Sequence, residues 1–198
     1  MLQVIRCGLI SHDVILPRDF IDTTYRILGK SASPSHDGSV SCSFAYKIQG
    51  GGAALVTWGE LAKAARKLPG LEITAPQPDF RLRGDALLKI KHITPTKLKK
   101  WGGSKIAWFD PEAYLRAMKG VTKITGRDDF PVDRVKFIKM RTDVRTWNLG
   151  CGFEEGFVGE IVITIPAAWA RVLKVAGLTG IGQKRSWGMG NVEVARVG

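Results

Sequence analysis

Extended and helical patterns alternate in a fixed order along residues 2–83. Residues 2–10 (LQVIRCGLI) are typical of a strand, and Pro17 opens a segment in which Phe20 and Ile27 share one helical face. Each such element has an apolar face that must pack against another element. The order of the elements therefore limits the chain to a few arrangements.

Two further strands and a helix complete this first unit. Strand-like residues 40–48 and 53–57 flank a turn at Gly50-Gly51-Gly52, which predicts a β-hairpin. A helical segment at 60–68 (ELAKAARKL) follows, and then an extended run at 71–83. The resulting order, βαββαβ, is that of the ferredoxin-like unit, a plan shared by RNA-recognition modules.

The second half is less regular but repeats the order. Its expected elements are a strand at 86–93, a helix after Asp110, extended runs at 134–141 and 157–165, a helix after Pro166 and a strand at 191–197. We predict an α+β fold of two tandem ferredoxin-like (RRM-like) βαββαβ repeats, the second irregular, in domains 1–80 and 86–198. Pro76, Pro78 and Gly84 favour a boundary near 75–86. A single extended α+β domain is the alternative.

Capping residues predict where the two helices of the second half begin and end. Asp110 is a suitable N-cap, Pro111 suits the first helical position, and Gly120 can end that helix. Pro166 opens the other helix and Gly177 closes it.

Charge indicates a polyanionic partner. The chain has 30 Lys and Arg against 18 Asp and Glu, a formal net charge of +12. Such a balance is typical of nucleic-acid binding. One basic stretch lies close to Trp101 and Trp108 and contains Arg81, Arg83, Lys89, Lys91, Lys97, Lys99, Lys100 and Lys105. Basic grooves with aromatic rings suit looped or single-stranded RNA, whereas a solvated basic face is the plainer interpretation.

A glycine-rich run, GLTGIGQKRSWGMGNVEV, occupies residues 177–194. Gly180, Gly182, Gly188 and Gly190 permit positive φ and a close approach of the backbone to a ligand. Lys184, Arg185 and Ser186 suit phosphate, and Lys139 and Arg141 are expected partners on a neighbouring strand. Trp187 could stack a base or fill space between the repeats. The run lacks the spacing of dinucleotide or Walker motifs. A purely structural glycine-rich connection is the competing interpretation.

Other classes of protein are not indicated. No apolar run approaches the ~20 residues that cross a bilayer, and residues 1–20 lack the order of a signal peptide, so we expect a cytoplasmic protein without membrane contact. Cys7, Cys42 and Cys151 are far apart and suggest neither a zinc site nor a disulfide framework. We expect no metal site and no cofactor.

Both ends of the chain resemble a known family. The segments VILPRDFIDTTYRIL, SHDG, SCSF and FVGEIVITIPAAWARVLKVAGLTGIGQKRSWGMGNVEV are similar to the CRISPR repeat-processing endoribonucleases, the sixth Cas family of the RAMP superfamily. The histidine turn is the more diagnostic motif, because the glycine loop is shared across the superfamily. The resemblance covers roughly residues 1–48 and 153–196.

The resemblance implies a metal-independent endoribonuclease that cleaves CRISPR precursor RNA within its repeats. In that reaction a ribose 2′-OH attacks the adjacent phosphate, which leaves a 2′,3′-cyclic phosphate and a 5′-OH. Members often keep the guide RNA that they produce, so CRISPR repeat RNA, guide RNA and other Cas effector subunits are the expected partners. The protein has only to align the 2′-OH, move protons and stabilise charge.

The resemblance also assigns candidate catalytic residues. His36 matches the histidine turn and can act as base or acid near neutral pH. Tyr25 is expected to orient the 2′-OH or the phosphate, and Lys30 to stabilise negative charge. His12 and His92 are reserve candidates.

Two other functions fit the same sequence. One is a non-catalytic RAMP subunit, similar to the fifth Cas family, that binds the 5′ handle of a guide RNA in an effector complex. The other is an RNA-binding module outside CRISPR systems. Cleavage activity and the histidine turn distinguish the endoribonuclease from both.

Overall fold

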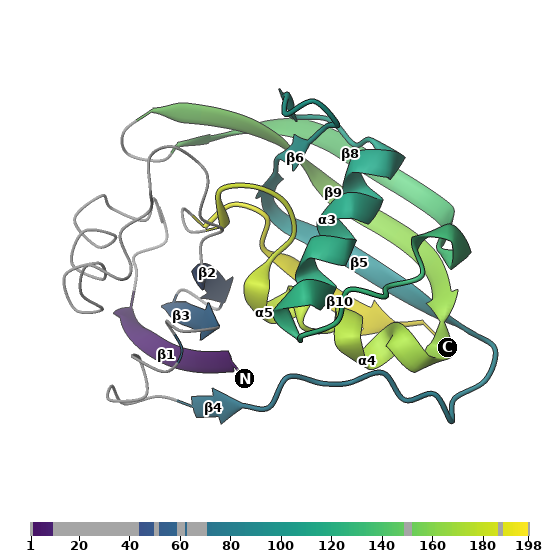
Figure 1. Cartoon of the computed structure of the whole chain (residues 1–198). Helices are drawn as coiled ribbons and strands as arrows, with labels where there is room; N and C mark the ends of the chain where they lie inside the picture. Colours follow the sequence, from purple (N-terminus) through teal and green to yellow (C-terminus); the bar gives the residue numbers. More distant parts are fainter. Residues whose placement is uncertain are drawn as a thin grey trace.

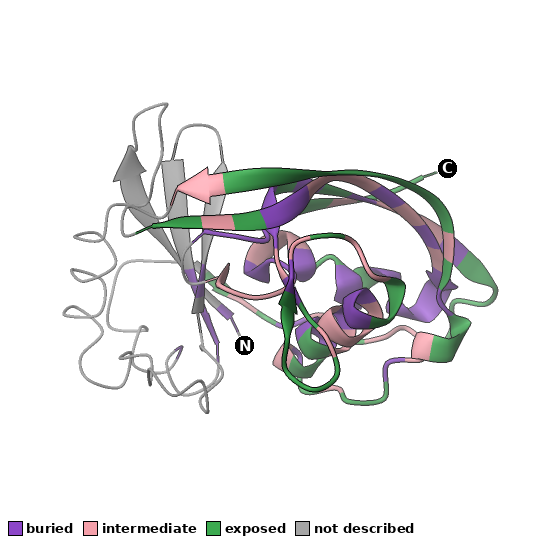
Figure 2. Cartoon of the chain, turned by 90° about the horizontal axis from the view of Figure 1, so that it is seen from above, coloured by how far each residue is buried: buried purple, intermediate pink, exposed green. Residues whose placement is uncertain are grey.

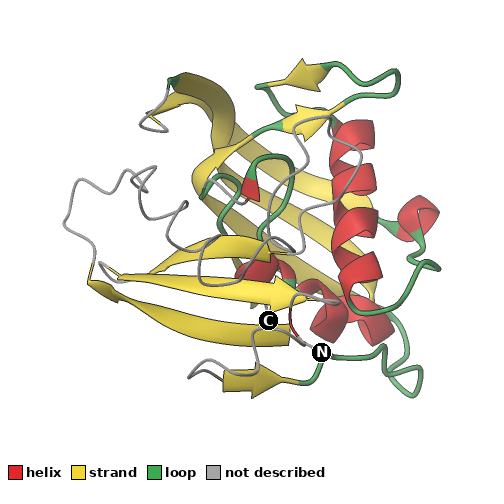
Figure 3. Cartoon of the chain, turned by 60° about the vertical axis from the view of Figure 1, so that its left-hand side comes forward, coloured by secondary structure: helices red, strands yellow, loops and turns green. Residues whose placement is uncertain are grey.

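The computed structural model describes residues 2–9, 44–49, 52–58, 62, 71–148, 152–185 and 188–197. Within these residues the chain forms two four-stranded antiparallel sheets and one short hairpin (Figures 1 and 3). The described strands are β1 (Leu2–Leu9), β2 (Phe44–Gln49), β3 (Gly52–Trp58), β4 (Leu71–Ile73), β5 (Asp85–Thr96), β6 (Leu98–Lys99), β7 (Lys105–Ile106), β8 (Lys136–Asn148), β9 (Phe153–Pro166) and β10 (Val192–Arg196). The described helices are α3 (Pro111–Ile124), α4 (Ala170–Leu173) and α5 (Ala176–Thr179), with 3₁₀ turns at Val132–Arg134 and Ala167–Trp169.

The first sheet has the strand order β2-β3-β1-β4. The expected hairpin is confirmed, since β2 and β3 pair in antiparallel register from Phe44 opposite Thr57 to Gln49 opposite Gly52. The extended run expected at 71–83 is wrong beyond β4, because residues 74–84 form no strand. Of the expected helix at 60–68 the structure describes Ala62, which is helical and buried.

The second sheet has the strand order β10-β5-β9-β8. Counted by position along each half of the chain, both sheets read fourth-first-third-second, the strand order of a ferredoxin-like unit. The β6–β7 hairpin is inserted between β5 and α3. The α+β ferredoxin-like class is therefore confirmed. The complete repeat of the first half depends on helices outside the described residues and stays a prediction.

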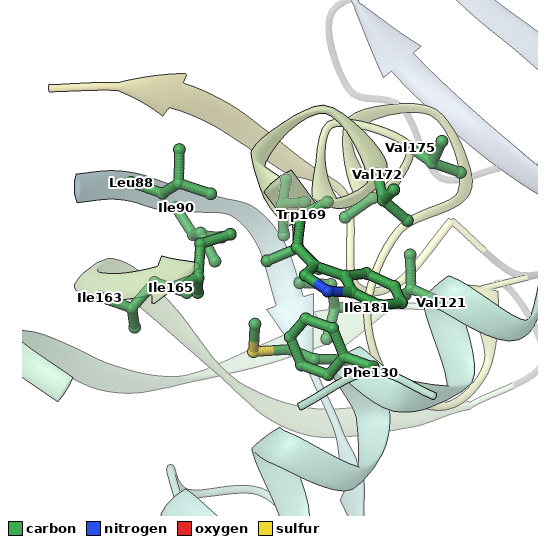
Figure 4. Close-up of a cluster of buried hydrophobic side chains, with 14 of the residues drawn as sticks. Leu88, Ile90, Val121, Phe130, Ile163, Ile165, Trp169, Val172, Val175 and Ile181 are labelled. Atoms are coloured by element: carbon green, nitrogen blue, oxygen red, sulfur yellow. The ribbon is translucent and has the colours of Figure 1, made fainter. Parts of the chain in front are cut away.

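Apolar side chains fill the space between the second sheet and its helices. Alternate residues of β5, such as Leu88 and Ile90, are buried, as are Ile163 and Ile165 of β9. Figure 4 shows these side chains facing Trp169, beside which Phe130 packs with ring centroids 5.4 Å apart. The alternation reflects the two-residue period of a strand with one covered face. The far end of the β8–β9 hairpin extends away from this core and is mostly exposed (Figure 2).

The start of α3 agrees with the sequence prediction and its end does not. Asp110 is the N-cap, its side chain accepting a hydrogen bond from the backbone N–H of Ala113, and Pro111 opens the helix. The helix continues through Gly120 to Ile124. The chain turns instead at Gly126, whose φ of +83° suits glycine.

Two further boundaries differ from the prediction. Pro166 is the last residue of β9 and, as expected, the N-cap of the helical segment, which begins as the 3₁₀ turn Ala167–Trp169 and continues into α4. Gly177, however, lies inside α5, which ends at Thr179 with Gly180 as its C-cap at a φ of +72°. Val132–Arg134 is a 3₁₀ turn, so the strand expected from residue 134 begins at Lys136. No helix in the described ranges is both long and apolar enough to span a membrane.

Candidate RNA-binding site

The glycine loop joins α5 to β10. Four of its glycines, Gly180, Gly182, Gly188 and Gly190, have positive φ. Lys184 also has a positive φ, of 53°, which a residue with a side chain adopts only at a cost in strain.

The glycines allow the loop to approach its own chain. A Cβ on Gly182 would lie 2.5 Å from the carbonyl oxygen of Lys97, and a Cβ on Gly190 would overlap the carbonyl oxygen of Ile181. At Gly182 and Gly190, therefore, glycine is required by contacts with the protein's own backbone, and the role of Gly182 in ligand binding stays a prediction. The space that their side chains would need is filled by protein backbone.

Hydrogen bonds fix this loop to the C-terminal end of β5 and to Lys97, which follows it. The backbone N–H of Gln183 donates to the carbonyl of Lys97 at 2.8 Å, and that of Gly190 donates to Pro95 at 2.9 Å. The Thr94 hydroxyl donates to the carbonyl of Gly188 at 2.8 Å and accepts from the N–H of Asn191 at 2.9 Å. Thr94 and Asn191 are buried, so the bonds of the Thr94 hydroxyl to the loop are shielded from solvent.

Glu154 of β9 joins two of the predicted RNA-binding lysines. Its two carboxylate oxygens form ion pairs with Lys97 and Lys184. Partial burial raises the pKa of Glu154, but hydrogen bonds from Lys184 and Lys97, with their charges, outweigh it and hold that pKa below its usual value. The cluster carries a net charge of +1, and a phosphate must compete with Glu154 for Lys184.

Arg185 connects the loop to the first sheet. Its guanidinium carbon lies 5.2 Å from the ring centroid of Trp58, within the range of a cation–π interaction. Trp58 is the last residue of β3 and is buried. The charge of Arg185 therefore lies where the glycine loop meets the first half of the chain.

Four other predicted residues share one face of the second sheet. Lys89 and Lys139 lie opposite Val162 on its two sides, and Lys91 and Arg141 lie opposite Glu160 in the same way. Side chains directly opposite one another point to the same face. The Nζ atom of Lys89 also lies 3.7 Å from Oε1 of Glu160, so the two side chains form an ion pair.

This basic sheet face and the glycine loop form two separate groups of cations. Lys89 and Lys91 alternate along β5 with buried residues such as Ile90, so they point to the opposite face of the strand from the buried Thr94, which bonds to the loop. Lys139 and Arg141 share that opposite face on β8. The group around the loop also includes Lys97, Lys99 and Lys100, because these residues follow the C-terminal end of β5, to which the loop is bonded.

The proposed catalytic residues His36, Tyr25 and Lys30 lie outside the described residues, as do Ser186 and the reserve candidate His12. The other reserve candidate, His92, is unsuited to catalysis because it is only 3% exposed. Its ring nitrogens are hydrogen-bonded to the hydroxyls of Thr96, at 2.6 Å, and Tyr114, at 2.9 Å. His92 supports the end of β5, on which the glycine loop rests.

Burial gives His92 an expected effect on stability. Desolvation lowers its pKa from 6.5 to about 3, so the folded protein keeps the ring neutral while the unfolded chain takes up a proton below pH 6.5. The free energy of unfolding should fall by about 1.4 kcal/mol for each pH unit below that point, and less steeply in His92→Gln. Urea unfolding of both proteins at pH 7, 6 and 5 measures the two slopes.

A second measurement keeps this prediction testable if His92→Gln does not fold. The ring ¹⁵N shifts of His92 in the parent protein should stay those of a neutral imidazole at pH 5. Equal slopes for the two proteins, or a ring that is charged at pH 5, would contradict the assignment.

The structure adds residues that the sequence did not single out. Glu154, Thr94 and Asn191 organise the glycine loop through contacts between residues far apart in the sequence. Glu154 and Lys184 are 30 positions apart, and Thr94 and Asn191 are 97 positions apart. No local pattern marks them. Within the described ranges, no group of three or more His, Cys, Asp or Glu side chains is placed to hold a metal ion.

Comparison with solved structures identifies the fold. The Cas6 protein TTHA0078 in a product complex matches with a TM-score of 0.67 and 17% identity, over 98% of this chain and 99% of that one. Thermus thermophilus Cas6 (TTHB231) matches with a TM-score of 0.63 and 17% identity, over 98% of each chain. The CRISPR RNA processing endoribonuclease Cas6b matches with a TM-score of 0.51 and 15% identity, over 99% of each chain. At these identities the likeness establishes the fold alone.

Sequence comparison identifies the family. A search among curated proteins returned no match. A family model described as CRISPR-associated endoribonuclease Cas6 matches residues 90–192, a range that includes three of the four residues of the basic sheet face, Lys91, Lys139 and Arg141, and the loop glycines from Gly180 to Gly190. Because this match extends over more than half of the 198 residues, the chain belongs to the CRISPR-associated endoribonuclease Cas6 family.

Proposed function

We propose that this protein cleaves CRISPR precursor RNA inside its repeats without a metal ion and then retains the guide RNA. Membership of the Cas6 family identifies the chain as an endoribonuclease of CRISPR RNA processing. The proposed mechanism of cleavage and RNA retention is supported by the glycine loop. There the cationic side chains of Lys97, Lys184 and Arg185 surround a backbone that hydrogen bonds hold in place. Such a surface suits the phosphates that flank a scissile bond.

The chemistry needs few protein groups because RNA carries its own nucleophile. The ribose 2′-OH attacks the adjacent phosphorus, its proton passes to a base, and the 5′ oxygen of the next nucleotide leaves with a proton from an acid. A 2′,3′-cyclic phosphate and a 5′-OH result. We assign one of the proton transfers to His36, orientation of the 2′-OH or phosphate to Tyr25, and stabilisation of the phosphorane charge to Lys30.

The two halves have different tasks in this proposal. Residues 1–80 contribute the catalytic turn, and residues 86–198 contribute the glycine loop and the basic sheet face. Lys184 exchanges Glu154 for an RNA phosphate, while Ser186 and the backbone at Gly180, Gly182 and Gly188 line the same path. Lys89, Lys91, Lys139 and Arg141 hold a more distant part of the repeat.

The alternative is a subunit that binds the 5′ handle of the guide RNA and cleaves nothing. Such a subunit shares the glycine loop and the basic surface, but the family that matches this chain is one of endoribonucleases. Family membership therefore favours cleavage. A place among other Cas subunits in the cytoplasm is part of the proposal.

Cleavage of repeat RNA in EDTA tests the mechanism. We expect the same single-turnover rate with and without a chelator, because the 2′-OH is the nucleophile and protons are moved by side chains. The 5′ fragment should resist a phosphatase until acid opens its cyclic phosphate. RNA folded beforehand and checked by native gel controls for the effect of ions on RNA structure.

A different result would be informative. A strict requirement for a divalent ion in the cleavage step, or fragments that carry a 5′-phosphate, would contradict attack by the 2′-OH. Tight binding without cleavage under every condition would favour the handle-binding subunit.

A further inference from the structure

A cavity of about 610 Å³ lies between the β6–β7 hairpin, helix α3 and the glycine loop. This volume is in the range of pockets that hold small ligands. All the charged side chains that line it are cationic, namely Lys99, Lys100, Arg116 and Arg185. The remaining lining residues include Trp101, Gly103, Gly120, Gly182 and Gln183.

Trp101 presents its indole ring to this cavity. It lies in the turn of the β6–β7 hairpin and is 83% exposed, the largest exposed fraction among the bulky apolar side chains of the described residues. The Arg116 guanidinium carbon is 4.9 Å from the ring centroid, and Arg116 is itself held by Glu112 at 2.8 Å and by the carbonyl of Lys99 at 3.3 Å. Trp101 thus offers a broad aromatic surface beside a fixed cation.

Gly120 widens the cavity at the surface of α3. A glycine inside a helix makes the helix less stable than an alanine does, because glycine loses more backbone entropy on folding and adds no side chain. A Cβ at Gly120 would meet no described atom within 4 Å, so packing around the helix does not require glycine there. The missing side chain leaves open space where Gly120 lines the cavity.

We propose that this cavity is a subsite for one unpaired nucleotide of the bound RNA. The base stacks on Trp101, and the phosphate contacts Lys99 and Arg185. A base must leave its duplex partner to stack in this way, which selects an unpaired position. Gly182 and Arg185 belong both to the cavity and to the glycine loop, so the nucleotide is continuous with the RNA path proposed there. This inference rests on the proposed function in taking RNA as the ligand.

The test combines a protein variant with a change in the RNA. Trp101→Ala should raise the Kd for repeat RNA roughly 5- to 100-fold, as expected for loss of one base–aromatic stack, and Trp101→Phe should recover much of that loss. Phe80→Ala is the matched control, because Phe80 is another exposed aromatic residue, 57% exposed, whose ring lies beside Trp169 and Arg127 and which does not line the cavity. We expect it to bind like the parent.

Abasic substitution at each unpaired position of the repeat then locates the nucleotide. One position should lose affinity with the parent protein and lose little more with Trp101→Ala, since both changes remove the same contact. Gly120→Leu, which fills the cavity, should weaken binding as Trp101→Ala does. Circular dichroism confirms that each variant is folded.

The outcomes separate this inference from the nuclease proposal. If the RNA is never cut but one abasic position couples to Trp101, the subsite stands and the catalytic proposal fails. Binding equal to the parent for both Trp101→Ala and Gly120→Leu overturns the subsite, even where cleavage is normal. Losses that are equal at all abasic positions also overturn it, because they indicate a surface that contacts no single base.

Discussion

Replacement of the single ribose 5′ of the scissile phosphate by 2′-deoxyribose should stop cleavage and leave binding nearly unchanged. The 2′-OH is one of many contacts in the complex but the only nucleophile in the proposed reaction. Its loss removes the reaction path and at most one hydrogen bond, worth about 0.5–1.5 kcal/mol of binding free energy. Single-turnover cleavage and filter binding with the two RNAs measure the two effects.

A deoxy substitution at a neighbouring ribose is the matched control, because it removes a 2′-OH without touching the nucleophile. That RNA should be cut at a rate near that of the all-ribose repeat. A deoxy RNA that binds well and is still cut at the original bond would imply attack by water.

His36→Ala should slow cleavage by ~10²–10⁴-fold while RNA affinity changes little. The substitution removes a group that moves a proton but no cation that binds phosphate. The pH–rate profile provides a second readout, since one limb of the parent profile should report the His36 ionisation and be lost in the variant. Single-turnover rates from pH 5 to 9 give both quantities.

His12→Ala serves as the control for His36→Ala, because it removes another imidazole from the same half of the chain. We expect it to cleave at the parental rate. If the cleavage rate falls in His12→Ala and not in His36→Ala, His12 is the catalytic residue. His92 is no longer a candidate, because its ring is buried and bonded through both nitrogens.

The sequence predicted elements better than their boundaries. The strands around 2–10, 86–93 and 157–165 were located correctly. In the latter two, the apolar pattern matches the burial of one sheet face. Helix ends were less accurate. A glycine such as Gly120 or Gly177 is compatible with a helix interior, and only the contacts of the following residues decide whether the helix continues.

The candidate site shows the same limit. Charge and glycine content located the loop, and four of its glycines have the expected positive φ. At two of these positions glycine is required by a contact within the protein. A side chain on Gly182 would clash with the carbonyl of Lys97, and one on Gly190 with the carbonyl of Ile181. Sequence spacing cannot show such contacts, because they join segments far apart in the chain. Glu154 was missed for this reason.

The attachment of the glycine loop to β5 has a consequence for how RNA is recognised. The described loop residues have lost their conformational freedom during folding, through the bonds of Gln183, Gly190 and Thr94. Binding therefore requires little further ordering of this part of the protein, which lowers the entropic cost of association. Single-stranded RNA is the more flexible partner. In the proposed complex, the loop is a rigid template and the RNA is the partner that changes shape.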